Sequence, residues 1–371
     1  QSRFRQLSKF IDGPIQPVFL NRLLDHHIEL DELKTLIAAK YGYDITNIEI
    51  HEQLRSVYWQ YDKNFILSLG DKQLWAKLIV ESAEINDSNL GRLLDIQQSV
   101  AQCLQLPVII PTTSHETFVS FKRSRVHYLW LMLYDKHIPL SERPSISINK
   151  QLTENIGQLM KRFHTCCNGY KLKSELVADL HWHYFTEKSI KRDKEVLQKR
   201  ILTVEGENRR SMLLTCVELL DKVSLVYCKK TIGHLAFCAD TVHLRTDIVP
   251  KSVDDLCIGH FAHVRYTCVI VDLLLCAIRL HDFEMMKDVG GSCKEIPMLE
   301  VIVDVIEGYS GNLGQADIDV AYQLVFGLMA SCLLDHVETS LALNIEKDRE
   351  TVAAVAREAL ECRFKQFEKI Y

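Results

Sequence analysis

Four histidines in the stretch 234–263 form the first group of side chains that could do chemistry: His234, His243, His260 and His263. Imidazole titrates close to neutral pH and is a common ligand of metal ions and anions. One interpretation is therefore an anion or metal site. The other, which we favour, is a set of partly buried histidines held by hydrogen bonds.

A second histidine pair stands in the string His181-Trp182-His183. Residues two apart do not share a face of a helix, and no third ligand follows at a metal-binding spacing. We interpret this string as aromatic core or surface residues.

The sequence lacks the short motifs that define several enzyme classes. It contains no G-x-x-x-x-G-K-[ST], G-x-G-x-x-G, H-E-x-x-H or G-x-S-x-G string, which argues against P-loop, dinucleotide, zincin and nucleophile-elbow chemistry. The 12 cysteines are scattered, with Cys166-Cys167 as the adjacent pair and no C-x-x-C. We predict reduced, mostly buried thiols in a cytoplasmic protein, without a disulfide framework or zinc ribbon.

Composition predicts a globular protein with ample core. The 371 residues are 47% hydrophobic, and 44 basic against 49 acidic residues give a formal charge of -5. Without a basic patch, neither nucleic acid nor a membrane surface is an expected partner. The chain begins at Gln1 and shows no signal peptide, although a segment upstream of it is left open. The most apolar run, Val269 to Ile278, is too short to span a membrane and contains Asp272, so we expect a core helix.

Periodicity predicts a sheet with one inserted helix in the first third of the chain. Helical spacing covers 30–41, with Gly42 as a stop, and 86–104. Alternating residues on either side of Gly70-Asp71 predict a two-residue hairpin, and further strands are expected at 108–111, 117–121 and 126–134.

Helical periodicity dominates from Gln151 onward, and three helices are expected at 301–309, 318–334 and 352–370. The predicted class is thus α+β, with a small antiparallel-sheet lobe at 1–134 and a larger helical lobe at 135–371. This order of elements is that of two-lobed kinase-like folds, although a fold alone establishes no activity.

Several local strings resemble hydroxylysine kinase and its relatives in the aminoglycoside phosphotransferase family, over nearly the whole chain. They include SVYWQYDKNFIL at 56–67 and WAKL at 75–78. The resemblance implies that Lys77 is the nucleotide lysine and Asp95 its helix partner. The alternative is an ordinary strand lysine and a solvated aspartate.

In that family the catalytic loop reads H-G-D-x-x-x-x-N, in which Asp takes the proton of the substrate hydroxyl and Asn binds metal. By resemblance, the matching string here is IGHLAFCADTV at 232–242. It places Leu235 at the position of the base and Asp240 at that of the Asn. Leucine cannot accept a proton.

The second metal ligand of the family is an Asp about 20 residues later, and by resemblance Gly259 in CIGHFAHV stands there. Glycine offers Mg²⁺ a backbone carbonyl only. The alignment of this stretch with the family motif could be shifted. In that case Asp247, Asp254, Asp255 or His260 would take over one of these roles.

Three functions follow as hypotheses. The first is a catalytically impaired pseudokinase that binds a small amine, an amino-acid-like ligand or a partner. The second is an active kinase that uses GTP or ATP with Mg²⁺ to phosphorylate a hydroxyl of an amino-acid-like substrate such as 5-hydroxylysine, with Lys77 on phosphate and Asp240 on metal. The third is a non-catalytic interaction protein that binds a protein partner or forms a homodimer.

Overall fold

The computed structural model describes residues 28–325 with gaps. The gaps are 52–62, 82–85, 105, 124–125, 134–136, 144, 169–190, 192–193, 196–197, 199–201, 203–206, 236, 240, 246–248, 260–263, 288–297, 311–312, 315, 318–319 and 322. By internal contacts the described residues form two compact units, one from 28–92 and 107–133 and one from 93–106 and 137–325. The predicted boundary at 134/135 lies in a gap and stays a prediction.

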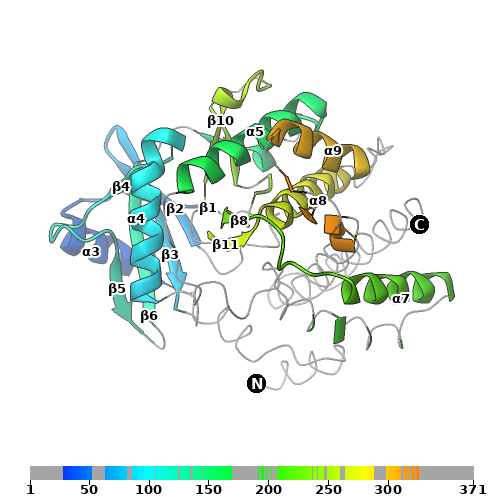
Figure 1. Cartoon of the computed structure of the whole chain (residues 1–371). Coiled ribbons are helices and arrows are strands. Elements are labelled where there is room, and N and C mark those ends of the chain that lie inside the picture. Colours follow the sequence, from blue (N-terminus) through cyan, green and yellow to red (C-terminus); the bar gives the residue numbers. More distant parts are fainter. Residues whose placement is uncertain are drawn as a thin grey trace. The chain divides into compact units, whose positions relative to one another are not determined.

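The first unit is built on an antiparallel sheet of six strands, shown in blue to green in Figure 1. The strands run in the order β1-β2-β3-β6-β4, and β5 also pairs with β6. Their bounds are β1 Asn47–His51, β2 Lys63–Leu69, β3 Lys72–Val80, β4 Ile109–Ile110, β5 Val119–Lys122 and β6 Val126–Leu133. Between β2 and β3 the chain turns at Gly70-Asp71, where Gly70 has a φ of 58°, a value that favours glycine. The predicted two-residue hairpin is confirmed.

Helix α3, Leu30–Tyr41, packs with this sheet. It buries Leu33, Ile37 and Tyr41 in one hydrophobic cluster with inward-facing strand residues such as Phe65 and Leu78. The helix ends at Gly42, whose φ of 72° is left-handed and whose N–H donates to the Ala38 carbonyl. The bounds predicted from periodicity are confirmed.

Helix α4, Asp87–Leu104, is the predicted inserted helix. Asn86 caps it, because the Asn86 Oδ1 accepts a hydrogen bond of 3.1 Å from the N–H of Asn89. One face of the helix buries Leu90, Leu94 and Gln97, whereas Asp95 is exposed. The polar side chain on the buried face is thus an amide rather than a carboxylate.

The second unit is mainly helical (Figure 1). Its helices are α5 Lys150–Cys167, α7 Glu207–Asp221, α8 Val269–Lys287 and α9 Met298–Tyr309, with short 3-10 turns η1 Leu140–Glu142 and η3 Val253–Asp255. Short strands form two small antiparallel sheets, one ordered β10-β9-β7 (Leu256–Ile258, Val242–Leu244, Ile138–Pro139) and one pairing β11 (Arg265–Cys268) with β8 (Lys230–Gly233). The predicted α+β class and the predicted core helix at Val269 to Ile278 are confirmed.

Helices α5 and α9 cross in close contact, side by side in Figure 1. A Cβ atom on Gly157 would lie 2.3 Å from the carbonyl oxygen of Val305, and one on Gly308 would lie 2.1 Å from that of Glu154. Both distances are far below van der Waals contact. Glycine on each helix therefore permits the crossing.

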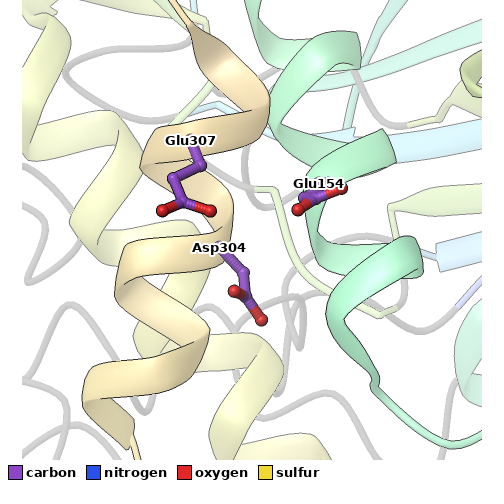
Figure 2. A group of neighbouring side chains, drawn as sticks. All are labelled: Glu154, Asp304 and Glu307. Atoms are coloured by element: carbon purple, nitrogen blue, oxygen red, sulfur yellow. The ribbon is translucent and has the colours of Figure 1, made fainter.

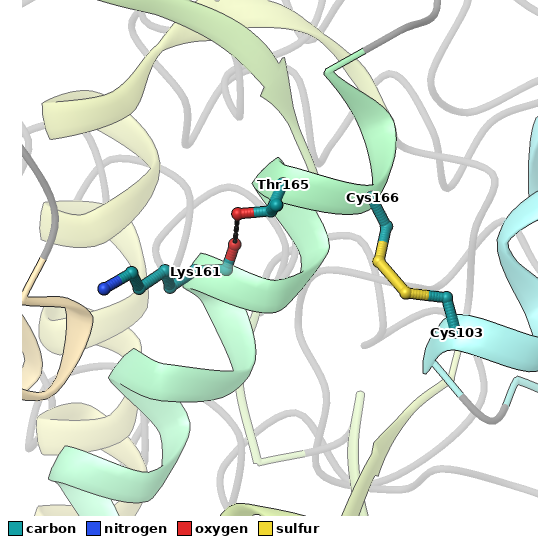
Figure 3. Close-up of a disulfide and its surroundings, with 4 residues drawn as sticks. All are labelled: Cys103, Lys161, Thr165 and Cys166. Atoms are coloured by element: carbon teal, nitrogen blue, oxygen red, sulfur yellow. Dashed lines mark hydrogen bonds between the residues drawn. A yellow bond between two sulfur atoms is a disulfide. The ribbon is translucent and has the colours of Figure 1, made fainter.

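Two cysteines correct the prediction of reduced thiols throughout. Cys103 in the last turn of α4 and Cys166 in the last turn of α5 form a disulfide (Figure 3). Sequence spacing did not indicate this pair, because 63 positions separate the two cysteines and the fold brings them together. The described free cysteines are buried, as predicted: Cys167, Cys228, Cys238, Cys257, Cys268 and Cys276. Within the described residues, none of the helices is both long and apolar enough to cross a membrane.

Candidate functional site

The candidate site is the turn that follows β8, the stretch to which the catalytic-loop resemblance points. Asp272, in the first turn of α8, receives two backbone hydrogen bonds from this turn. The N–H of His234 donates to Oδ2 at 2.9 Å and the N–H of Leu235 donates to Oδ1 at 2.8 Å. One buried carboxylate therefore fixes the path of the chain through the turn.

Leu235 has an unusual backbone conformation. Its φ is 56°, in the left-handed region that glycine adopts readily and leucine does not. A second side chain of α8 holds the same residue, because Arg279 Nη1 donates to the Leu235 carbonyl at 2.5 Å. With Asp272 on its N–H and Arg279 on its carbonyl, Leu235 is held in a conformation that its side chain disfavours.

A histidine side chain also contacts the Asp272 carboxylate and favours its ionised form within the core. The His164 Nε2 donates to Asp272 Oδ2 at 2.9 Å, and the Tyr309 hydroxyl lies 3.1 Å from the His164 Nδ1. Burial alone would raise the pKa of Asp272, but the hydrogen bond and charge of His164, with that of His234, lower it below its ordinary value. The turn is thus anchored to α5, α8 and α9 through one charged group.

Gly233 leaves no room for a larger residue beside this carboxylate. A Cβ atom at Gly233 would lie 2.4 Å from Thr267 Cγ2 and 3.0 Å from Asp272 Oδ2. A side chain here would displace β11 or the carboxylate. The sequence therefore needs glycine immediately before the turn for a packing reason.

Gly259, predicted at the second metal position, follows β10 directly. Its N–H donates to the Thr241 carbonyl at 2.7 Å, and its own carbonyl accepts a hydrogen bond of 3.2 Å from His234 Nε2. A Cβ atom at this position would lie 2.5 Å from His243 Nε2. The imidazole of His243 fills the space into which a carboxylate would have to extend.

These residues do not fit a Mg²⁺ ion at Gly259. Mg²⁺ requires several hard oxygen ligands in near-octahedral arrangement. Here the side chain is missing, the carbonyl already accepts a hydrogen bond and an imidazole occupies the adjacent volume. Asp240, the other predicted metal residue, lies outside the described residues.

Thr241, next to Asp240, has its hydroxyl engaged within its own turn. Its Oγ1 accepts from the N–H of Cys238 at 3.0 Å and donates to the Cys238 carbonyl at 3.2 Å. The residue is fully buried. Thr241 therefore stabilises the connection between β8 and β9.

Lys77 lies in the middle of β3 and is 1% exposed. It is paired with Trp130 of β6, and its Nζ lies 5.8 Å from the centre of the indole ring. Such a distance is within the range of a cation–π interaction. The predicted pairing of Lys77 with Asp95 stays a prediction.

The predicted histidine group divides between described and undescribed residues. His234 and His243 are buried, with exposed fractions of 0% and 4%. His260 and His263 lie in a gap, as does the pair His181 and His183. His234 Nε2 donates to the Gly259 carbonyl, and His243 in β9 packs beside the same glycine. The burial of both agrees with the interpretation of core histidines.

Sequence reasoning missed His164, Tyr309 and the role of Asp272. The available signal was Asp272 itself, a carboxylate within the most apolar run of the chain. A buried charge requires partners. The identity of those partners, 38 and 108 residues away for His234 and His164, could not be read from spacing.

One acidic cluster lies away from this turn, where α5 faces α9. It comprises Glu154, Asp304 and Glu307, shown in Figure 2. The ammonium of Lys150 lies 3.5 Å from Glu154, 3.9 Å from Asp304 and 3.2 Å from Glu307. Lysine therefore already supplies a cation to these carboxylates.

Comparison with known proteins gives structural matches only. No family model and no curated protein matches the sequence. A microcompartment-associated aminopropanol kinase superposes with a TM-score of 0.62 and 11% identity, covering 91% of this chain and 95% of that one. An amicoumacin kinase in complex with AMP-PNP and Ca²⁺ superposes with a TM-score of 0.60 and 12% identity, covering 92% of this chain and 94% of that one.

A spectinomycin phosphotransferase in complex with ADP and spectinomycin gives a TM-score of 0.58 at 11% identity, covering 91% of this chain and 98% of that one. This chain has the kinase-like fold of the aminoglycoside phosphotransferases. The predicted fold is confirmed on this ground. At these identities the likeness concerns the fold, and the kinase-like fold here carries the turn fixed by Asp272.

Proposed function

We propose that this chain is a catalytically impaired member of the small-molecule kinases, which keeps the framework of the catalytic loop without its acidic side chains. The carrying observation is the turn at 233–235. Asp272 and Arg279 hold its backbone as a defined structure, while Gly259 is packed against His243 with no carboxylate. Phosphoryl transfer depends on positioning and charge neutralisation, and the second of these is deficient here.

The register of the motif supports the same proposal in a modified form. In H-G-D the glycine follows the histidine, and Leu235, with its φ of 56°, follows His234 in a conformation suited to glycine. We therefore place His234 and Leu235 at the first two positions and Ala236 at the base. The Asn position then falls on Thr241 rather than Asp240. Neither register supplies a carboxylate as base.

The proposed ligand is a small amine or amino-acid-like molecule, and the proposed location is the cytoplasm. The hydroxylysine kinase resemblance and the small-molecule substrates named for structural neighbours support this ligand class. Nucleotide binding through Lys77 is part of the proposal. The spectinomycin phosphotransferase is in complex with ADP, and the amicoumacin kinase is in complex with AMP-PNP.

A thermal-shift experiment tests the proposal. The chain is melted with ATP or GTP, each with Mg²⁺ and with EDTA. A ligand that binds the folded state raises the melting temperature by mass action. We expect the same rise with Mg²⁺ and with EDTA, because the metal-binding side chains are deficient. A shift seen only with Mg²⁺ contradicts the proposal and favours the active kinase. Absence of any shift with either nucleotide favours the interaction protein.

The variant Lys77→Ala tests whether this lysine contacts the nucleotide phosphates, and Asp95→Ala is its matched control. Lys77→Ala should abolish a phosphate-dependent shift, because the lysine point charge is the predicted phosphate contact. Asp95→Ala should leave the shift unchanged, since this side chain is exposed. Equal loss in both variants would support the pairing predicted from sequence instead.

A further inference from the structure

The disulfide between Cys103 and Cys166 differs from the other described cysteines in its access to solvent. Cys103 is exposed and Cys166 is half-buried. The free cysteines whose side chains are described are all buried. A small thiol or disulfide arriving from solvent therefore meets this pair before the others.

The buried thiols are also chemically less reactive. Burial raises the pKa of Cys167 to about 12 and that of Cys228 to about 12, and it also raises the pKa of Cys276 well above its ordinary value. The thiolate is the attacking species in exchange with a disulfide, so these thiols react slowly. Cys166 and Cys167 are neighbours in sequence, yet Cys166 is half-buried whereas Cys167 is fully buried in the core.

The disulfide links the ends of two helices that share a core. α4 contributes Val100 and Leu104 to the same hydrophobic cluster as Phe163 and Cys167 of α5. Figure 3 shows the bond between the last turn of each helix. We expect opening of the bond to remove a crosslink and to leave these apolar contacts in place.

We propose that Cys103 and Cys166 form a reversible thiol–disulfide site, which small thiols open and small disulfides close, and which controls how firmly the C-terminal half of α4 is held to α5. In the opening direction one glutathione thiolate attacks the bond and forms a mixed disulfide with one cysteine. A second glutathione thiolate then attacks the glutathione sulfur of the mixed disulfide and releases the protein cysteine. The products are two protein thiols and one oxidised glutathione, so this two-electron exchange needs no other reactant. Disulfides of cytosolic proteins are characteristically of this transient kind.

The test is a redox titration of the full chain under native conditions. The protein is equilibrated at a series of ratios of reduced to oxidised glutathione, quenched with a maleimide and analysed by peptide mass spectrometry. We expect Cys103 and Cys166 to become labelled together as the ratio rises, while the described buried cysteines stay unlabelled. Hydrogen exchange of 93–104 should become several-fold faster in the reduced form.

Two variants give the controls. Cys103→Ser should show the fast exchange at every ratio, and Cys167→Ala should titrate like the unchanged protein, because its neighbour still forms the bond. The proposal is overturned if the bond resists glutathione until the chain unfolds, if Cys103 and Cys166 stay thiols under oxidising conditions, or if opening leaves exchange of α4 unchanged. Should Cys103→Ser fail to fold, the titration of the unchanged chain decides alone.

Discussion

At the scale of single residues, the account depends on Asp272. Its carboxylate accepts two backbone N–H groups and a histidine N–H while 1% exposed. Removal of this carboxylate should strongly destabilise the folded chain, because the polar groups that remain would lose their hydrogen-bond partner in the core.

Asp272→Asn should lower the free energy of unfolding by about 3 kcal/mol. The amide cannot accept all three hydrogen bonds with both of its polar atoms, since one of them is a donor. Urea unfolding measures the change. Asp254→Asn is the control: this exposed carboxylate pairs with Arg162 at the surface, and its loss should cost less than about 1 kcal/mol. Equal losses in the two variants would mean that Asp272 is not the anchor of the turn.

The pH dependence of this contribution has a definite sign. The pKa of Asp272 is lowered in the folded chain, so its stabilisation is complete above the unfolded pKa of about 3.9 and is lost as pH falls through the lower folded pKa. The stability difference between the unchanged chain and Asp272→Asn should therefore be constant from about pH 7 to pH 5 and shrink below about pH 4. Urea unfolding at these pH values measures it. A difference that already shrinks near pH 6 would mean that the pKa is raised instead.

At the scale of elements, the close crossing of α5 and α9 gives a sharper test of packing. A methyl group on Gly308 would overlap the backbone of Glu154, which is part of a helix and cannot move alone. Gly308→Ala should therefore destabilise the chain by about 2 kcal/mol. Thermal or urea unfolding gives the value.

The control for this variant is Gly91→Ala in α4. There the added Cβ would lie 3.7 Å from the ring of Phe118, an ordinary contact. Alanine is favoured over glycine within a helix, so this variant should gain about 0.5 to 1 kcal/mol. If Gly308→Ala gains stability as Gly91→Ala does, helix propensity rather than the crossing governs the result at Gly308.

The elements also show what sequence could predict. Local signals predict α3, α4, the β2–β3 hairpin and the buried character of α8. These signals are hydrophobic periodicity, Gly42 as a helix stop and Gly70-Asp71 as a turn. The disulfide, the Asp272–His164–Tyr309 network and the packing of His243 against Gly259 depend on long-range contacts. No spacing rule encodes such contacts. The resemblance located the turn, but its register became testable only through the φ of Leu235.

The disulfide also makes a prediction at this scale. Reduction removes a loop closure of 63 positions from the unfolded chain, and the chain-entropy estimate for such a loop is about 4 kcal/mol. Urea unfolding with and without a reductant should show a loss of this order or somewhat less. Cys103→Ser should abolish the difference between the two conditions. A difference that persists in that variant would assign the effect to another cysteine pair.

At the scale of the whole molecule, the chain has a kinase-like fold in which Asp272 and Arg279 hold the backbone of the turn at 233–235. We propose that this turn is a catalytic loop without its acidic side chains. Folding and stability depend on Asp272, Arg279 and the glycines, and none of these requires the chemistry of phosphoryl transfer. A chain can therefore retain this fold after losing the reaction. Under our proposal, these contacts keep the turn in place whether or not the chain catalyses a reaction.

Phosphoryl transfer itself is the most direct measurement of this claim. The purified chain is incubated with γ-labelled GTP or ATP, Mg²⁺ and 5-hydroxylysine or a panel of amino alcohols, and the release or transfer of label is followed over hours. The account predicts no turnover above the rate of the nucleotide alone. Transfer at about 1 s⁻¹ or faster, the range of ordinary kinases, that is lost in Lys77→Ala would contradict it.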